Sequence, residues 1–427
     1  MKGLGARLRR AVGTPVAHRE PTPALRDHLL QVTEAHRRRD RTGAPSLPLE
    51  VACGGEPVET PYGPIWVITH RLTLQTQHGQ RVFGGFFKRS LADAQRLTGD
   101  KRLGPLCPDD ACFLDIEATG LEHGAGTMAF LVGVAFREAD MLVTRQYLLR
   151  EPSEERALLY CLLQDLDAHP MLVTFNGKSY DLSVLESRMV MCRFLDKSAC
   201  RLKLRPHLDL LHLSRNLHRG RWSDTRLGTL ENKLLGFYRT DDLPGALVPS
   251  SWFHFLRTSD ATALGQAVTH NLHDVWSMVV LADHLLETAN DHSSHANTAP
   301  RLSANLGHLL VRRREFDSAV ETLTPFLSQP DIDAEVRQQA LNTLSTAARR
   351  AKQPKIEIDA LRQLHHLCPA DDAILTRLSI ALERRGDDIP AALIAATEVH
   401  RLAPSPTSLR RVQRLESKLA RTRSVAC

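Results

Sequence analysis

The sequence predicts an α/β domain, with a mixed central sheet flanked by helices, followed by an all-α domain of helical repeats. Three observations support this prediction. Strand-like runs follow one another between residues 111 and 149 and then alternate with helices up to about residue 192. After residue 300 the strand-like runs disappear. Within that last region, two segments resemble each other at a distance that suits short helical hairpins.

The length and composition indicate a globular protein. At 427 residues the chain is long enough for two or three domains. No apolar run approaches the roughly 18 residues of a membrane span, and the basic N-terminus lacks the apolar region of a secretory signal. The eight cysteines are scattered without zinc-type spacing, which predicts reduced thiols. The sequence therefore predicts a cytoplasmic protein with no membrane partner.

Residues 1–45 carry the charge imbalance of the chain. They contain ten Lys and Arg against four Asp and Glu, a surplus equal to the net charge of +6 for the whole sequence. We expect a disordered basic arm, with a helix near residues 23–39 as its one candidate element. Such an arm either attracts phosphates through counterion release or only keeps the chain in solution.

The later elements follow from periodicity and turn residues. Residues 46–110 contain short β-like runs broken by turn signals, which predicts a small β-rich lead-in. The main α/β domain is placed at residues 111–288, and a polar stretch at 289–300 is read as a linker. The elements expected in the main domain are strands at 111–117, 127–136, 141–149 and 171–175, and helices at 152–168, 180–192 and 261–287.

Residues 301–427 show the pattern of a tetratricopeptide-like repeat. Its apolar and small positions recur 72 residues apart, a distance that leaves room for a degenerate middle copy. The positions are Leu306, Gly307, Leu310 and Ala319 in one copy and Leu378, Leu382 and Ala391 in the other. Stacked helical hairpins leave a concave surface suited to a protein partner. An ordinary helical domain without a repeat is the alternative.

Asp115 and Glu117 end the first strand of the main domain, in the run FLDIEATGL. Side chains two residues apart on a strand point to the same side, so both acids share one rim of the sheet. Carboxylates arranged in this way suit Mg²⁺ or Mn²⁺. Because an Asp-x-Glu triplet is expected about once by chance in a chain of this length, other groups must support the site.

Two further segments supply such groups. In TFNGKSYDLSVL, Asp181 lies in the first turn of a helix, where the unpaired N–H groups favour a carboxylate and where it either serves a site or only caps the helix. In VTHNLHDVW, His270 and Asp274 are four residues apart and share one face of a helix, whereas His273 lies about 60° away from that line.

These three segments resemble the exonuclease motifs of the DEDD superfamily, DnaQ-like enzymes with a ribonuclease H-like fold. FLDIEATGL is similar to the first motif, FNGKSYDLSVL to the second and HNLHDV to the third. The resemblance is strongest to the YprB-like branch, related to bacterial mitomycin repair exonucleases, in which the nuclease domain precedes tetratricopeptide-like repeats. It extends over roughly residues 46–290 and implies a location in the bacterial cytosol.

The resemblance implies a 3′→5′ exonuclease that hydrolyses phosphodiester bonds with two Mg²⁺ or Mn²⁺ ions, acting on DNA in repair. It assigns the metal ligands to Asp115, Glu117, Asp181 and Asp274, and the general base to His270. The chain departs from the histidine-type members in one respect. Those members place the base five residues before the last Asp, where this chain has Thr269; an offset of four is typical of the tyrosine-type members.

A basic segment between the second and third motifs predicts contacts with nucleic acid. Phosphates need cationic side chains, and unpaired bases need an aromatic surface. The candidates are Arg215, Arg219, Arg221, Trp222 and Arg226, together with Thr119, Asn176 and Asn271 next to the proposed ligands. A solvated loop is the alternative for the basic segment. Asn176 and Asn271 either orient the ligands or the substrate, or only stabilise local turns and caps.

Two other functions are compatible with the sequence. An RNA-processing exonuclease has the same motifs, because they respond to phosphates and metal ions rather than to the 2′-hydroxyl. An interaction protein, in contrast, would use the repeats and basic segments to recruit a helicase or another repair protein, and its nuclease site would be vestigial. Four intact carboxylates argue against a vestigial site.

Overall fold

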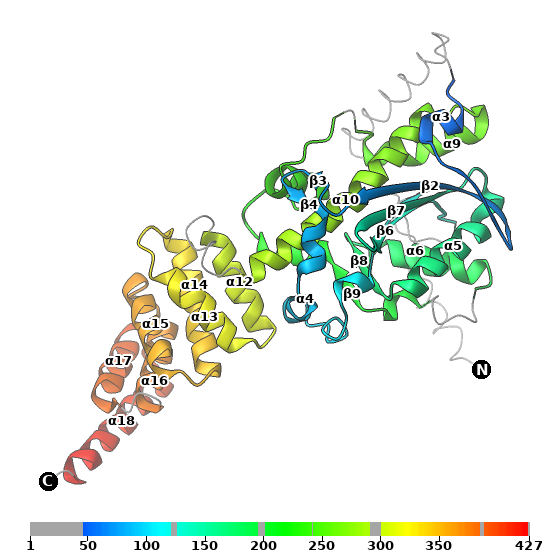
Figure 1. Ribbon diagram of the computed structural model, residues 1–427. Coiled ribbons are helices and arrows are strands. Elements are labelled where there is room, and N and C mark those ends of the chain that lie inside the picture. Colours follow the sequence, from blue (N-terminus) through cyan, green and yellow to red (C-terminus); the bar gives the residue numbers. More distant parts are fainter. Residues whose placement is uncertain are drawn as a thin grey trace, which may run out of the picture. The chain divides into compact units, whose positions relative to one another are not determined.

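The structure, a computed structural model, describes residues 46–120, 126–194, 201–240, 242–290, 300–384 and 388–425 (Figure 1). The predicted arm at residues 1–45 and most of the predicted linker at 289–300 lie outside these residues. The chain divides into two compact units. One combines residues up to Cys53 with Leu243–Ala267, and the other combines Gly54–Asp242 with Val268–Cys427.

The smaller unit joins two distant stretches of sequence. Its elements are α3 (Leu49–Cys53), η7 (Gly245–Leu247), α9 (Val248–Thr258) and the beginning of α10 (Thr262–Asn290). The amide of Ala261 donates to the carbonyl oxygen of Leu47 over 2.9 Å. Gly265 permits the close approach of the two stretches, because a Cβ there would lie 2.4 Å from the carbonyl oxygen of Ala52.

The described part of the larger unit contains a seven-stranded mixed sheet in the order β1-β2-β7-β6-β5-β8-β9. The strands are β1 (Glu56–Thr60), β2 (Gly63–Thr73), β5 (Ala111–Ala118), β6 (Ala129–Glu138), β7 (Met141–Leu148), β8 (Met171–Thr174) and β9 (His207–Asp209). β5 pairs antiparallel with β6 and parallel with β8. The predicted mixed sheet is therefore confirmed.

The lead-in at residues 46–110 contributes directly to this sheet. β2 pairs with β7, and β1 forms the edge next to β2. β1 has the sequence EPVET and is exposed along nearly its whole length. Its charged side chains and its proline discourage pairing with a further strand at this edge. β3 (Gln77–His78) and β4 (Arg81–Val82) form a separate two-stranded sheet.

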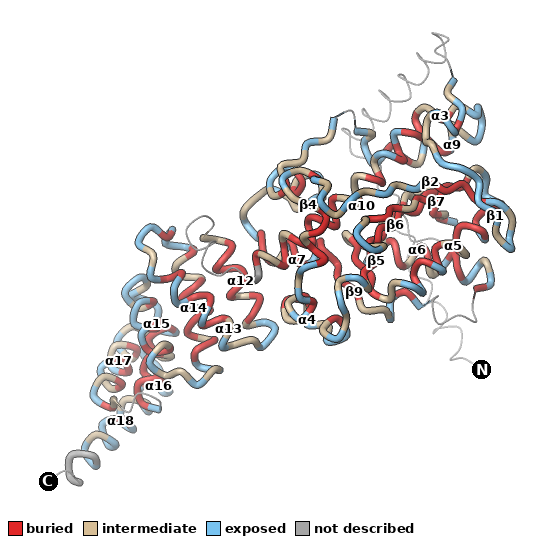
Figure 2. The backbone as a smooth tube through the Cα atoms, in the orientation of Figure 1, coloured by how far each residue is buried: buried red, intermediate tan, exposed pale blue. Residues whose placement is uncertain are grey.

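Helices lie on both faces of the sheet, and the alternation of side chains along β7 reflects this arrangement. On one face, the indole Nε1 of Trp276 in α10 donates to the hydroxyl of Thr144 over 3.0 Å. On the opposite face, the hydroxyl of Tyr147 donates to Asp165 in α5 (Glu155–Ala168). The central strands are buried on both sides (Figure 2), which explains why β8 is a continuous apolar run, MLVT.

Short helices and turns complete this part of the larger unit. They are η1 (Phe83–Lys88), α4 (Leu91–Thr98), η2 (Pro108–Asp110), η3 (Pro152–Glu154), α6 (Asp181–Met191), η5 (Leu202–Leu204), α7 (Leu210–Leu217), α8 (Leu227–Leu230) and η6 (Glu231–Leu235). Aromatic side chains fill the core between η1 and the sheet: the ring centroids of Phe86 and Phe113 are 5.1 Å apart with the rings edge to face.

The described residues after 300 form helices without strands. The helices are α12 (Pro300–Arg312), α13 (Phe316–Leu327), α14 (Ala334–Arg350), α15 (Pro354–Leu367), α16 (Asp372–Arg384), α17 (Ile389–Leu402) and α18 (Pro406–Val425). Each packs against the next one along the chain. Every second helix begins after an interval close to the 34 residues of a tetratricopeptide unit. The predicted many-helix region is confirmed, and its membership of the tetratricopeptide family stays a prediction.

In the part of the chain that the structure describes, no helix has both the length and the apolar character needed to cross a bilayer. The six cysteines described there are free thiols, in agreement with the sequence prediction.

Candidate metal centre

Asp115 and Glu117 lie near the end of β5 and point to the same face of the sheet. They alternate with Ile116, which is buried. β5 ends next to β8, and because these two strands are parallel, their carboxyl ends meet at one edge of the sheet. The period of two along the strand therefore places both acids at the edge that the sequence predicted.

Asp181 reaches the same edge from the other parallel strand. β8 ends at Thr174, a turn follows, and Asp181 is the first residue of α6. Its side chain is 6% exposed, and its Oδ2 atom has no hydrogen-bond partner among the described residues. A cap uses only one carboxylate oxygen, so the buried Oδ2 of Asp181 is available for a further ligand. The geometry thus favours the site over the cap alone.

α10 supplies His270 and Asp274, one helical turn apart. The Nε2 atom of His270 lies 3.7 Å from Oδ2 of Asp274. Ligand atoms of Glu117, His270 and Asp274 all lie within 4.8 Å of one another. The spacing of four residues on the helix therefore brings both side chains to the end of β5.

The carboxylates at this edge repel one another. Burial and the charges of Asp274, Glu117 and Asp181 hold the pKa of Asp115 well above its usual range. Burial and the neighbouring carboxylates also hold the pKa of Glu117 well above its usual range. For the same reasons, the pKa of Asp181 is raised to about 8. A cation among these groups would relieve the repulsion and favour their ionised forms.

Asn271 is a hydrogen-bond partner of Asp115. It is fully buried, and its Nδ2 atom donates to Oδ2 of Asp115 over 2.8 Å. Its own Oδ1 accepts from Nε2 of Gln146 over 2.8 Å, and Gln146 also donates to the carbonyl oxygen of Val268. Opposite Asp115 on β6 is Gly133, where a Cβ would lie 2.2 Å from Oδ1 of Asn271. Asn271 therefore contacts Asp115 directly, and its role in orienting a metal ligand stays a prediction.

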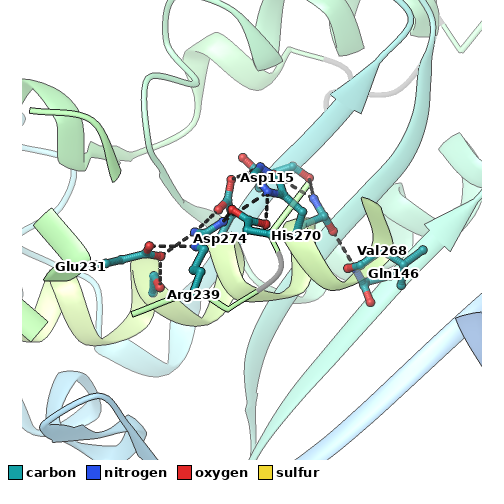
Figure 3. Close-up of polar contacts among 10 residues, drawn as sticks. Asp115, Gln146, Glu231, Arg239, Val268, His270 and Asp274 are labelled. Atoms are coloured by element: carbon teal, nitrogen blue, oxygen red, sulfur yellow. Dashed lines mark hydrogen bonds and ion pairs between the residues drawn. The ribbon is translucent and has the colours of Figure 1, made fainter. Parts of the chain in front are cut away.

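Arg239 is the site residue that the sequence reasoning missed. Its guanidinium pairs with Asp274, and it also donates to Glu231, from Nε over 2.8 Å and from Nη2 over 2.5 Å (Figure 3). Asp242, close by on the same loop, lies 2.7 Å through Oδ1 from Nδ1 of His270. The loop carries no recognisable motif, so only the fold reveals either residue.

The remaining predicted residues have mainly local contacts. Thr119 lies just beyond β5, and its Oγ1 accepts from the amide of Met128 over 3.0 Å. Asn176 adopts a positive φ of 72°, and its amide donates to Asp209 over 3.0 Å. Asn176 therefore stabilises a local turn, which is one of the two roles that the sequence left open for it. Its side chain remains a candidate for substrate contacts only as a prediction.

In the basic segment, Trp222 is already engaged. The ring of His218 stacks on it at 5.0 Å between centroids, and the Arg221 guanidinium lies 4.8 Å from its ring centre. Arg215, Arg219 and Arg226 are exposed. A stacking surface at Trp222 would require Arg221 or His218 to move, and the nucleic-acid contacts of this segment stay predictions.

The donor set suits a hard divalent cation. The four carboxylates supply the oxygen ligands that Mg²⁺ and Mn²⁺ prefer, and the imidazole of His270 lies beside them. The buried Oδ2 of Asp181 has no partner among the described residues, and the acids repel one another, so a bound cation would be stabilised here. We therefore regard Asp115, Glu117, Asp181, His270 and Asp274 as the candidate metal centre.

Comparisons with known proteins agree with this fold. Residues 112–286 match the RNase_H superfamily. The uncharacterized protein YprB of Bacillus subtilis (strain 168) is 32% identical over 235 residues, which are 54% of this chain and 55% of that protein. This chain thus matches about half the length of that relative.

Among solved structures, the alignment with a chain of the APC/C hetero-tetramer Cut9-Hcn1 covers 62% of this chain and 57% of that chain. The sequence identity is 14% and the TM-score is 0.24. A likeness of this size carries no argument about the fold. The superfamily match covers all five residues of the candidate metal centre. Residues 112–286 are thus similar in sequence to the ribonuclease H superfamily, and they have a mixed sheet with an acidic site at the carboxyl ends of its parallel strands.

Proposed function

We propose that the protein is a DEDD-type 3′→5′ exonuclease that hydrolyses phosphodiester bonds in DNA with two Mg²⁺ or Mn²⁺ ions, in the bacterial cytosol. One observation carries the proposal. Four carboxylates and an imidazole from β5, α6 and α10 converge at one edge of the sheet, and a buried oxygen of Asp181 has no partner among the described residues. Asp115, Glu117, Asp181 and Asp274 would hold the ions.

The bound ions would activate a water molecule and stabilise the charge that develops on the leaving oxygen. The residues of this chain prepare the site for that chemistry. Asn271 holds one carboxylate oxygen of Asp115 in place and leaves the other free for a ligand. Such hydrogen bonds to metal ligands reduce the reorganisation that ion binding requires.

His270 is suited to accept the proton of the attacking water. Its Nδ1 lies 2.7 Å from the carboxylate of Asp242 and 3.4 Å from Nη1 of Arg239. The shorter contact favours a proton on Nδ1, donated to Asp242, and leaves the lone pair on Nε2. Nε2 is the nitrogen on the side of Asp274. Asp242 would also stabilise the imidazolium that forms when Nε2 takes the proton.

The proposed reaction consumes one water for each nucleotide released. The water oxygen bonds to phosphorus, its proton passes to His270, and the bond from phosphorus to the 3′ oxygen of the preceding nucleotide breaks. That oxygen then takes up a proton. The products are a nucleoside 5′-monophosphate and a chain that is shorter by one nucleotide and ends in a 3′-hydroxyl.

We extend the proposal to the helices α12 to α18. Helices that pack mainly against their neighbours along the chain form extended surfaces, and such surfaces commonly bind other proteins. A helicase or another DNA-repair protein is the partner that we propose for this region.

A time course on 5′-labelled strands tests the nuclease proposal. Matched single- and double-stranded DNA and RNA are incubated with Mg²⁺, Mn²⁺ or EDTA. We expect a ladder that shortens from the 3′ end, faster on DNA, and no reaction in EDTA. Asp115→Ala and Asp274→Ala should abolish the activity, because each removes a metal ligand, while circular dichroism shows an intact fold.

Asp140→Ala is the matched control. Asp140 is an exposed acid in the turn between β6 and β7, away from the strand end that carries Asp115. This variant should retain full activity. Full activity of either ligand variant would contradict the assignment of the site, a single internal cut would indicate an endonuclease, and faster degradation of RNA would favour RNA processing.

A further inference from the structure

A positive charge already lies among the carboxylates of the candidate metal centre. The guanidinium of Arg239 pairs with Oδ1 of Asp274 and lies 3.4 Å through Nη1 from Nδ1 of His270. Asp274 and His270 are two of the three residues whose ligand atoms cluster within 4.8 Å. Arginine keeps its charge at all physiological pH values. It therefore partly supplies the charge that the carboxylates require.

Arg239 is held in this place by a buried anchor. Glu231 is 1% exposed and binds the guanidinium through two hydrogen bonds, from Nε over 2.8 Å and from Nη2 over 2.5 Å. The hydroxyl of Ser277 in α10 also donates to Glu231. If Arg239 swung into solvent, Glu231 would remain as a buried charge without its cation, which is strongly unfavourable. The guanidinium therefore stays beside the site.

The contacts of Arg239 differ in what their loss would cost. The two bonds to Glu231 are made with a side chain that has no second ion pair among the described residues. The contact with Asp274, in contrast, uses an acid that is 18% exposed in its side chain and that a divalent cation would also bind. A small displacement of the guanidinium would release Asp274 while the bonds to Glu231 are kept. Arg239 can therefore release Asp274 while it keeps its hydrogen bonds to Glu231.

We propose that Arg239 is the counter-ion of the metal-free site and competes with the divalent cation for Asp274. Glu231 keeps the guanidinium next to the site in both states. Arg239 is thus a positioning residue that holds Asp274 in place before the ion arrives and lowers the affinity for that ion. The inference rests on the proposed metal site and adds a residue that controls its occupancy.

Calorimetric titration of the full chain with Mn²⁺ tests this inference directly, without an activity measurement. Arg239→Gln removes the competing charge, and we expect the dissociation constant of Mn²⁺ to fall roughly tenfold, the size of one lost charge-assisted contact. Arg239→Lys keeps a charge but cannot contact Glu231 and Asp274 in the same way. Its affinity for Mn²⁺ should therefore lie between those of the wild type and Arg239→Gln.

Lys233→Gln is the matched control, because it removes the same charge from an exposed position in η6. Its affinity for Mn²⁺ should equal that of the wild type. Equal or weaker Mn²⁺ binding by Arg239→Gln would overturn the inference, as would the same tightening in the control. If no protein of the series bound Mn²⁺, the proposed metal site itself would fail, so the two failures are distinct.

Arg239→Gln leaves Glu231 without its cation and can unfold the protein. The double variant Glu231→Gln with Arg239→Gln removes both charges, and the side-chain amide oxygen introduced by Glu231→Gln can still accept from Ser277. We expect the same tightening of Mn²⁺ binding in the double variant. An unchanged dissociation constant in a folded double variant would also overturn the inference.

Discussion

Asp181→Asn should stabilise the metal-free protein, and the gain should grow with pH. The ordinary pKa of an aspartate is 3.8, and in the folded protein that of Asp181 is about 8. Between these values the folded state binds a proton that the unfolded state has lost. The stability of the wild type therefore falls as the pH rises from about 4 to about 8. Asparagine does not titrate and escapes this loss.

The size of this stability difference follows from the shift in the pKa of Asp181. Each pH unit between the two pKa values costs about 1.4 kcal/mol of unfolding free energy. Between pH 5 and pH 8 the advantage of the variant should therefore grow by at most about 4 kcal/mol. Asp115 and Glu117 titrate together with Asp181, so the protons are shared and the observed change will be smaller. At about 1 to 2 °C per kcal/mol for a chain of this length, the melting temperatures should separate by up to roughly 4 to 8 °C.

Thermal unfolding in EDTA at pH 5, 6, 7 and 8 measures this difference, with Asp140→Asn as the control in an exposed turn. Saturating Mn²⁺ should narrow the difference at pH 8. At a hundred times its dissociation constant the ion adds about 2.7 kcal/mol to the wild type, and the variant has lost a ligand. Parallel pH curves for the wild type and Asp181→Asn would refute the electrostatic reasoning.

Three other substitutions have defined outcomes. Asn271→Ala should weaken Mn²⁺ binding about 10- to 100-fold in calorimetry, because Asp115 loses the hydrogen bond that orients it. His270→Ala should lower the cleavage rate by about 10² to 10⁴ and flatten the acid limb of its pH profile, whereas an unchanged profile would exclude it as the base. Glu383→Ala should destabilise the C-terminal helices by about 1 to 3 kcal/mol in denaturant unfolding, because the charge-assisted contacts of the carboxylate with Arg411 and Arg414 are lost, while Arg414 is half exposed and stays solvated.

The parts of the site that follow a local period could be predicted from the sequence. Asp115 and Glu117 follow the period of two along a strand, and His270 and Asp274 follow the turn of a helix. Asp181 was predicted because a helix N-terminus follows an apolar strand. Each of these inferences needs only neighbours in the sequence, and the mixed sheet then brings the three segments together.

Other features depend on contacts between distant residues. Arg239 is 35 positions from its partner Asp274, and nothing in its own loop indicates that pairing. Trp222 was expected to offer an open stacking surface, but residue type alone does not reveal that Arg221 and His218 cover it. The strand β9 has only three residues, which is too short for any periodic signal.

The helix α10 sets the spacing of several distant parts of the larger unit. Along its length, Asn271 and Asp274 reach the metal site, Ser277 reaches the anchor of Arg239, and Asp283 pairs with Arg81 and Arg89 near the small sheet. Each residue of a helix advances the chain by 100° and about 1.5 Å. One residue inserted between Asn271 and Asp283 would turn the later contacts away from the earlier ones. Lineages of this protein should therefore vary in the length of their loops and keep the length of this helix segment unchanged.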